Sequence, residues 1–170
     1  MIRFKPVIWL WIVFVLASVG CDPSDTTPSG TSDPVDNAEF QPLIEDEILT
    51  YTNNYRAQHG LNPLYMREDV RTVARQHSLD MLDRNFFDHT NPDGESPADR
   101  LKNAHISYTA WAENIALNSG ATDPASTVMN QWINSEGHRL NILNTAVTHI
   151  GIGVVRAGET YYYTQLFMRP

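Results

Sequence analysis

A short run near the carboxyl end, Ser135–Leu143 (SEGHRLNIL), holds the residues best suited to chemistry. In this run, Glu136 and His138 stand on either side of Gly137. Residues two apart point to nearly opposite sides of a helix but share a face of extended chain. Glycine is also the residue type that most often ends a helix in a left-handed turn. We therefore predict that a helix breaks at Gly137, so that an acid and an imidazole face one cavity.

Two other segments carry side chains of the same types. Phe86–His89 (FFDH) is expected to end a helix and lead into a turn, and Ala112–Ala116 (AENIA) places Glu113 within an apolar stretch. Two imidazoles and two carboxylates that converge would suit a divalent metal, because neutral imidazole is a common ligand and carboxylate a ligand or its hydrogen-bond partner. The same four groups could also act as general acids and bases. Spacing alone leaves both chemistries open.

Structural interpretations of these residues also stay open. His89 could cap a helix or a turn, and Glu113 could pair with an arginine such as Arg139. The acid and imidazole beside Gly137 could stabilise a bend through hydrogen bonds. His77 lies on the apolar face of an expected helix, and we interpret it as a satisfied core residue.

Four helices are expected to position these segments, from apolar residues at helical spacing. Serine or aspartate followed by proline, at Ser96-Pro97 and Asp123-Pro124, is typical of a helix start, with the polar residue as N-cap and proline at the first helical position. The expected ranges are 43–59, 68–84, 96–103 and 123–135.

Strand-like sequence dominates the carboxyl end. His149–Val155 and Tyr161–Phe167 are rich in β-branched and aromatic residues, and Ala157–Glu159 is a turn between them. Trp111–Leu117 is a further candidate strand. Helices on both sides of a small, mostly antiparallel sheet would form a three-layer α/β/α sandwich, which we expect over residues 41–170.

The amino terminus of this 170-residue chain predicts export. Residues 1–20 have a positive start followed by the apolar run Val7–Val19, which is shorter than the roughly 20 residues that span a bilayer, so a signal peptide is favoured. Cys21 is the only cysteine, and its position after small residues resembles the bacterial lipobox, in which the cysteine is lipidated. We expect Cys21 to anchor the protein to a membrane outside the cytoplasm. The alternatives are an uncleaved signal anchor and simple secretion.

Residues 21–40 are rich in Pro, Ser, Thr and Asp and contain no basic residue. Such a stretch buries too little apolar surface to fold, so it is predicted to be a disordered tether. It carries much of the net charge of −8. The rest of the chain is only mildly acidic and has no stripe of Lys and Arg, which argues against nucleic acid as a partner.

Several well-defined enzyme motifs are missing from the sequence. It has no HExxH zinc-peptidase motif and no GxSxG serine-hydrolase motif. The segment from His89 begins like a calcium loop, but Arg100 stands at the twelfth position, where that loop needs glutamate. The one cysteine lies at the predicted anchor, which excludes a thiol nucleophile in the domain.

Four segments in order resemble a known family: FFDH at 86–89, AENIA at 112–116, SEGHRLNIL at 135–143 and YYYTQLF at 161–167. They are similar to the CAP superfamily of cysteine-rich secretory, antigen 5 and pathogenesis-related 1 proteins, also called SCP domains. FFDHTNPDGESPADRL is similar to its bacterial branch, which typically lacks disulfides. The resemblance covers about 43–167 and implies an α/β/α sandwich.

By position, the resemblance places the family's cavity tetrad on His89, Glu113, Glu136 and His138. It implies that the two histidines hold a divalent cation, zinc above others, with the two glutamates beside them. The expected function is a membrane-tethered extracytoplasmic module whose cleft binds this metal and a lipid, peptide or glycan. The alternative is a hydrolase, most plausibly a peptidase, in which Glu113 or Glu136 would act as the catalytic residue.

Overall fold

The structure is a computed structural model that describes residues 38–170. The predicted signal peptide, the lipidation site Cys21 and nearly all of the predicted tether lie outside the described residues. Within them, the helices are α1 (Pro42–Gln58), α2 (Glu68–Asp83), α3 (Pro97–Asn103), α4 (Pro124–Asn134) and α5 (Glu136–Ile142). The strands are β1 (Glu39–Phe40), β2 (Tyr65–Met66), β3 (Ala110–Ser119), β4 (His149–Ala157) and β5 (Thr160–Arg169).

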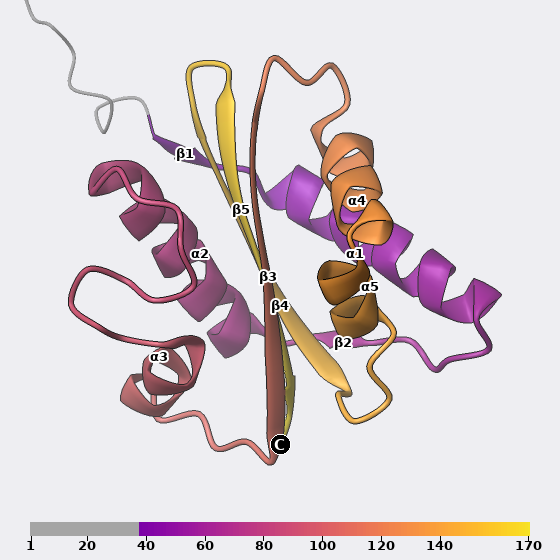
Figure 1. Cartoon of the computed structure of the whole chain (residues 1–170). Helices are drawn as coiled ribbons and strands as arrows, with labels where there is room; N and C mark the ends of the chain where they lie inside the picture. Colours follow the sequence, from indigo (N-terminus) through magenta and orange to yellow (C-terminus); the bar gives the residue numbers. More distant parts are fainter. Residues whose placement is uncertain (1–37) are drawn as a thin grey trace, which may run out of the picture. The chain divides into compact units, whose positions relative to one another are not determined.

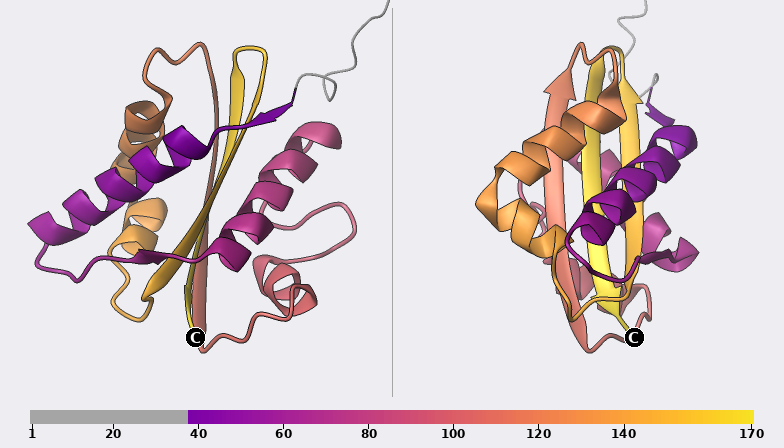
Figure 2. Two further views of the ribbon diagram at one scale, coloured as in Figure 1. Left: turned by 180° about the vertical axis from the view of Figure 1, so that it is seen from behind. Right: turned by 90° about the vertical axis from the view of Figure 1, so that its right-hand side faces the viewer.

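One sheet divides the domain into three layers, which confirms the predicted α/β/α sandwich. Its strand order is β1-β4-β5-β3, and β2 pairs with β4 beside β1. All pairs are antiparallel except β2 with β4. Helices α2 and α3 lie on one face, while α1, α4 and α5 lie on the other (Figure 1). The right-hand view of Figure 2 looks at the sheet through the second group.

The predicted helix starts are confirmed at α3 and α4. The Ser96 hydroxyl oxygen accepts a hydrogen bond from the Asp99 backbone N–H, and the Asp99 carboxylate accepts one from the Ser96 backbone N–H, which completes a capping box. Asp123 accepts from the Ser126 backbone N–H in the same way at α4. Proline follows the cap in both helices, where its missing N–H costs nothing.

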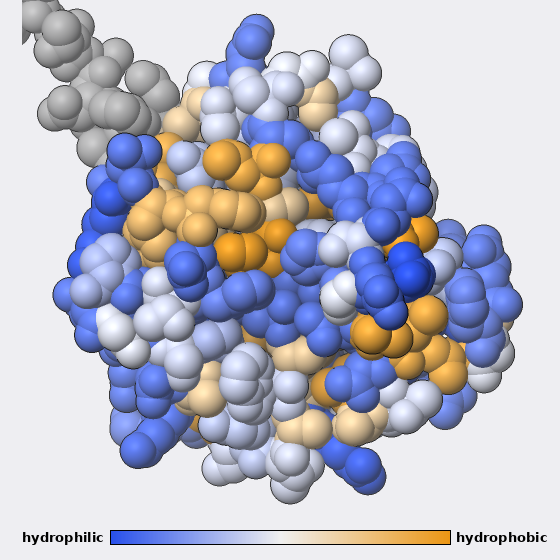
Figure 3. Space-filling model, in the orientation of Figure 1, coloured by the Kyte–Doolittle hydropathy of each residue, from blue (hydrophilic) through white to orange (hydrophobic). Residues whose placement is uncertain are grey.

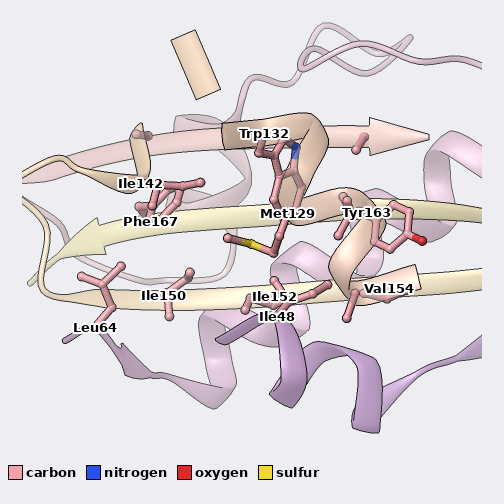
Figure 4. Close-up of a cluster of buried hydrophobic side chains, with 14 of the residues drawn as sticks. Ile48, Leu64, Met129, Trp132, Ile142, Ile150, Ile152, Val154, Tyr163 and Phe167 are labelled. Atoms are coloured by element: carbon pink, nitrogen blue, oxygen red, sulfur yellow. The ribbon is translucent and has the colours of Figure 1, made fainter. Parts of the chain in front are cut away.

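Two apolar clusters hold the layers to the sheet. Figure 4 shows the larger one, in which Trp132 and Met129 of α4 point toward strand residues such as Tyr163 and Phe167. The Trp132 and Tyr163 rings meet edge-on at 6.4 Å, a favourable aromatic geometry. On the opposite face, Val73 and Leu101 belong to a smaller cluster under α2 and α3.

Helix α2 packs so closely on β4 that only glycine fits at two positions of the strand. A Cβ at Gly151 would lie 2.3 Å from the Val70 carbonyl carbon, and one at Gly153 would lie 2.3 Å from that of Ala74. The absence of these side chains therefore sets the position of α2, which carries His77 and leads to the His89 loop.

Two expectations are corrected. Gly137 does not end a helix: it lies inside α5 and does not have a positive φ, and the break comes at Ser135, which has extended backbone (φ −96°, ψ 121°). Glu39 and Phe40, assigned to the tether, pair with β4 as β1, so the ordered domain begins before residue 41. A strand of two residues such as β1 forms only because it pairs with a neighbouring strand, so no local sequence pattern predicts it.

None of the helices between residues 38 and 170 is both long enough and apolar enough to cross a lipid bilayer.

Candidate functional site

The candidate site is built on β3, which forms one edge of the sheet. Successive strand residues point to opposite faces. Glu113 therefore faces the α2/α3 layer, while Asn114 faces α5, as their hydrogen bonds confirm. In Figure 1 this strand runs between the two helical layers.

The Glu113 carboxylate is the centre of the charged cluster. Its side chain is 1% exposed. His89 Nδ1 donates to Glu113 Oε1 at 2.8 Å, and Arg100 Nη2 donates to Oε2 at 2.7 Å. Both carboxylate oxygens are thus occupied by charge-assisted hydrogen bonds, which are the stronger kind.

Arg100 joins this carboxylate to the loop that carries His89. From α3, its Nη1 donates to the His89 carbonyl at 2.9 Å and to the Glu95 carbonyl at 3.1 Å. The arginine partner of Glu113 is therefore Arg100, and the suggested Arg139 instead donates to the Ile133 carbonyl. The sequence alone did not reveal this role of Arg100. It showed only that Arg100 takes the twelfth position of a calcium-loop-like segment, where such a loop needs glutamate.

His77 also belongs to the cluster, and its expected status as a satisfied core residue is only partly right. It is buried, and its Nε2 lies 3.1 Å from the Asp88 carbonyl and 4.0 Å from Glu113 Oε1. Its Nδ1, however, is buried and has no partner in the described part of the chain. Burial lowers the pKa of His77 more than the Glu113 charge raises it, so this imidazole stays neutral.

Helix α5 is held against β3 by asparagines. Asn141 donates to the Glu113 carbonyl at 3.1 Å and to Asn114 Oδ1 at 2.9 Å. Asn114 in turn donates to the His138 carbonyl at 3.1 Å and to Gln165 Oε1 at 3.0 Å. These bonds fix the helix turn that carries His138 beside the strand that carries Glu113.

The two histidines of the predicted tetrad have opposite electrostatic environments. Burial, and then the charge of nearby His89, lower the pKa of His138. Its Nδ1 is buried without a partner, and its ring makes no hydrogen bond within residues 38–170. The bond to Glu113 raises the pKa of His89, whose side chain is 46% exposed and whose Nε2 has no partner in the same part of the chain.

Glu136 is the tetrad residue that does not join the others. It is exposed in the first turn of α5 and makes no hydrogen bond or ion pair with a described residue. Because α5 is helical through Gly137, Glu136 and His138 point to nearly opposite sides, which is the reverse of our expectation.

These donors suit a metal ion only in part. Imidazole is a good ligand for zinc. In such sites the ring nitrogen that does not bind the metal usually donates a hydrogen bond to a carboxylate, as His89 Nδ1 does to Glu113. Between residues 38 and 170, however, no three His, Cys, Asp or Glu side chains form a group that could hold a metal. The site therefore offers two imidazoles and leaves other coordination positions to water or to a bound molecule.

The surface around this edge is mostly hydrophilic. Figure 3 shows the face of Figure 1, on which apolar residues form separate areas divided by hydrophilic ones. Exposed large apolar side chains near the site segments include Phe87, Trp111 and Leu140. Scattered residues of this kind are ordinary on protein surfaces.

Comparison with known proteins places the chain in a family. The chain is 44% identical over 124 residues to the uncharacterized protein YkwD of Bacillus subtilis, which is 73% of this chain and 46% of that protein. It is 40% identical over 131 residues to the uncharacterized membrane protein YlbC of the same species, 77% of this chain and 36% of that one. The chain thus spans less than half the length of these relatives.

Solved structures agree with this relationship. An extracellular SCP-domain protein from Bacillus anthracis superposes with a TM-score of 0.69 at 35% identity, over 76% of this chain and 41% of that chain. An outer surface protein from Borrelia burgdorferi shares the fold, with a TM-score of 0.70 at 21% identity over 78% of this chain and 98% of that one. The model of the CAP family, the cysteine-rich secretory protein family, matches residues 49–167. The chain therefore belongs to the CAP family.

Proposed function

We propose that the domain is a non-catalytic binding module that holds a divalent cation beside β3 through His89 and His138. The single observation that carries the proposal is His138, a neutral imidazole whose buried Nδ1 has no partner among residues 38–170 and which is near enough to His89 for the charge of that ring to lower its pKa. Buried polar groups normally have partners, so an orphan of this kind favours a ligand.

The hydrogen bonds of His89 support the same conclusion. A carboxylate only accepts, so Nδ1 of His89 carries a proton, and the neutral ring, which is the form that binds a metal, has its lone pair on Nε2. Arg100 and the Glu113 carboxylate hold the ring in this orientation. Zinc is the cation that two imidazoles fit best among the common divalent ions, and when bound it would attract an anionic or carbonyl oxygen of a ligand.

Hydrolysis is less well supported. Catalytic zinc sites have three protein ligands, and this site offers two. Each oxygen of Glu113 already accepts a hydrogen bond, and the side chain is 1% exposed, which limits the access of a water molecule to the carboxylate. Glu136, the other catalytic candidate, is exposed and makes no hydrogen bond or ion pair with either histidine. A lipid, peptide or glycan with an oxygen donor remains the expected type of ligand.

Zinc binding tests the proposal on the full-length protein in detergent. Titration calorimetry should find one zinc ion per chain, and His138→Ala and His89→Ala should each weaken binding at least about tenfold. The matched control is His59→Ala, an exposed histidine at the end of α1. Unchanged zinc affinity in His138→Ala would refute the proposed ligand set. Peptide turnover that is lost in Glu136→Ala would instead support the hydrolase.

The location is proposed from the amino-terminal sequence. The similar proteins described as extracellular, outer-surface or membrane proteins support a position outside the cytoplasm. A lipid on Cys21 would anchor the domain, since each buried acyl methylene contributes about 0.8 kcal/mol. Cys21→Ser should move the protein from the membrane fraction to the soluble fraction, and retention on membranes would favour an uncleaved signal anchor.

A further inference from the structure

A pocket lies at the opposite end of α5 from His138. It is a cavity of about 470 Å³ between the chain that joins α1 to β2 and the chain that joins α5 to β4. The two connections lie next to each other, since the Tyr65 backbone N–H donates to the Thr148 carbonyl at 3.2 Å. In Figure 1 they run below α5. The walls include Leu61, Tyr65, Thr145 and Thr148, with Arg56 from α1.

Arg56 has a clear structural role in this pocket. Its Nη1 donates to the Ile142 carbonyl at 2.6 Å and to the Asn144 carbonyl at 3.0 Å, and its Nε donates to the Asn62 carbonyl at 2.9 Å. A cation at the end of a helix satisfies the last carbonyl groups and matches the helix dipole. Arg56 thus fastens the end of α5 to α1.

Its charge nevertheless has no counter-ion in the described part of the chain. Arg71, Arg75 and Arg100 each pair with a carboxylate. Arg56 is 3% exposed and pairs with none between residues 38 and 170. Burial alone lowers its pKa, which agrees with the lack of a nearby acid. A buried charge without an opposite charge is costly, and proteins normally provide one.

The pocket is arranged to supply that opposite charge from outside. Arg56 Nη2 has no acceptor among the described residues, although the other two guanidinium nitrogens do. Arg56 is the only charged side chain among the residues that line the cavity. Thr145 adds a hydroxyl as a hydrogen-bond donor, and Leu61 adds apolar surface, whereas the Thr148 hydroxyl lies 2.9 Å from His149 Nδ1 and is already engaged there. Guanidinium groups bind carboxylate and phosphate through paired N–H groups.

We infer that this pocket binds a small molecule with one oxyanion group, a carboxylate or a phosphate, which takes the free Nη2 of Arg56 and sets a small apolar body against Leu61. The cavity volume is within the range of ligand pockets and exceeds the needs of a bare ion. The inference is independent of the metal proposal, because it uses none of the residues that would bind zinc.

Ligand titration on the full-length protein tests the chemistry. Benzoate and phenyl phosphate are the probes, and benzamide is the neutral control of matched shape. At least one of the two anions should bind with a Kd of about 1 mM or tighter, and benzamide should bind at least about tenfold more weakly. Binding of benzoate alone assigns a carboxylate, and binding of phenyl phosphate alone assigns a phosphate. Equal binding of benzamide, or no binding of either anion, would overturn the inference.

A matched pair of variants tests the location without disturbing Arg56. Thr145→Glu places a carboxylate in the pocket beside the guanidinium and should weaken binding of the anionic probe at least about tenfold. Thr145→Gln has nearly the same shape as Thr145→Glu without the charge and keeps a hydrogen-bond donor in its amide, so it should bind the anionic probe at least about tenfold more tightly than Thr145→Glu does. Equal affinity in the two variants would overturn the assignment. Zinc binding should remain unchanged in both, which separates this test from that of the metal site.

Discussion

Replacing Glu113 by glutamine removes one negative charge from the site and keeps the shape of the side chain. In the wild type, Arg100 and Glu113 are a buried pair, with side chains 8% and 1% exposed. Glutamine leaves the guanidinium without a counter-ion. Its amide nitrogen or oxygen must also face either the Nδ1–H of His89 or the N–H of Arg100, so one of the two hydrogen bonds is weakened or replaced by a clash of donors.

The expected cost follows from this geometry. Removing one partner of a buried ion pair costs about 3–5 kcal/mol. Arg100 keeps its hydrogen bonds to two carbonyls, and His89 is half exposed, so the lower end applies. We expect a loss of about 3 kcal/mol in the free energy of unfolding and a fall of about 10 °C in Tm. Urea unfolding followed by circular dichroism measures the free energy of unfolding, and thermal unfolding followed by the same signal measures Tm.

The pH dependence has a definite sign. The folded-state pKa of His89 is raised above the ordinary 6.5, first by its hydrogen bond to Glu113. Its contribution to stability is therefore full below the unfolded pKa and is lost as the pH rises through the folded pKa. The Arg100 contribution persists because arginine stays protonated. The destabilisation by Glu113→Gln should thus be larger at about pH 6 than at about pH 9.

Two controls make the test decisive. Glu136→Gln is the matched substitution at an exposed glutamate that pairs with none of the residues 38–170, and it should change stability by less than about 0.5 kcal/mol. Arg100→Met combined with Glu113→Gln should cost at least about 1 kcal/mol less than the sum of the single changes, because the two side chains are in direct contact. If Glu113→Gln were as stable as the wild type at both pH values, the buried cluster would not hold the site together.

Two further predictions concern the elements that position the site, and thermal unfolding measures each. Gly153→Ala should cost more than about 3 kcal/mol or prevent folding, because its methyl group would meet the α2 backbone. Gly137→Ala should instead stabilise the protein by about 0.5–1 kcal/mol, since nothing lies within 4 Å of the added atom. A loss of stability in Gly137→Ala would contradict the helical conformation at Gly137 and support the left-handed turn that we first expected there. Asn141→Ala should cost about 1–3 kcal/mol through its two lost hydrogen bonds, while Asn134→Ala, at an exposed position of α4, should be nearly neutral.

Local sequence was enough to predict most of the fold. The starts of α3 and α4 follow from a capping residue and a proline, which act over three or four positions. The long strands β3, β4 and β5 follow from composition and a turn, as expected. Local reasoning failed at β1, which exists only because β4 accepts it, and at Gly137, where packing of α5 against β3 outweighs the weak helix propensity of glycine.

The candidate site was harder to predict, because its contacts join distant parts of the chain. The resemblance to a family located His89, Glu113 and His138, and the structure brings the first two into direct contact. The family resemblance placed Glu136 beside them as well, but the helical backbone of α5 points this side chain to nearly the opposite side from His138. The partner of Glu113 was identified as a possible arginine, but the wrong one was named.

By itself, the sequence determined the helices with strong caps, the three long strands, the layered architecture and the family. These features depend on periodicity and on short motifs, so neighbours along the chain are sufficient to specify them. Only the tertiary structure decided that Arg100 and His77 join Glu113, that Glu136 does not, and that Arg56 is buried without a counter-ion among residues 38–170. Burial and charge pairing depend on which elements pack together, and that is set by the whole core rather than by any one segment.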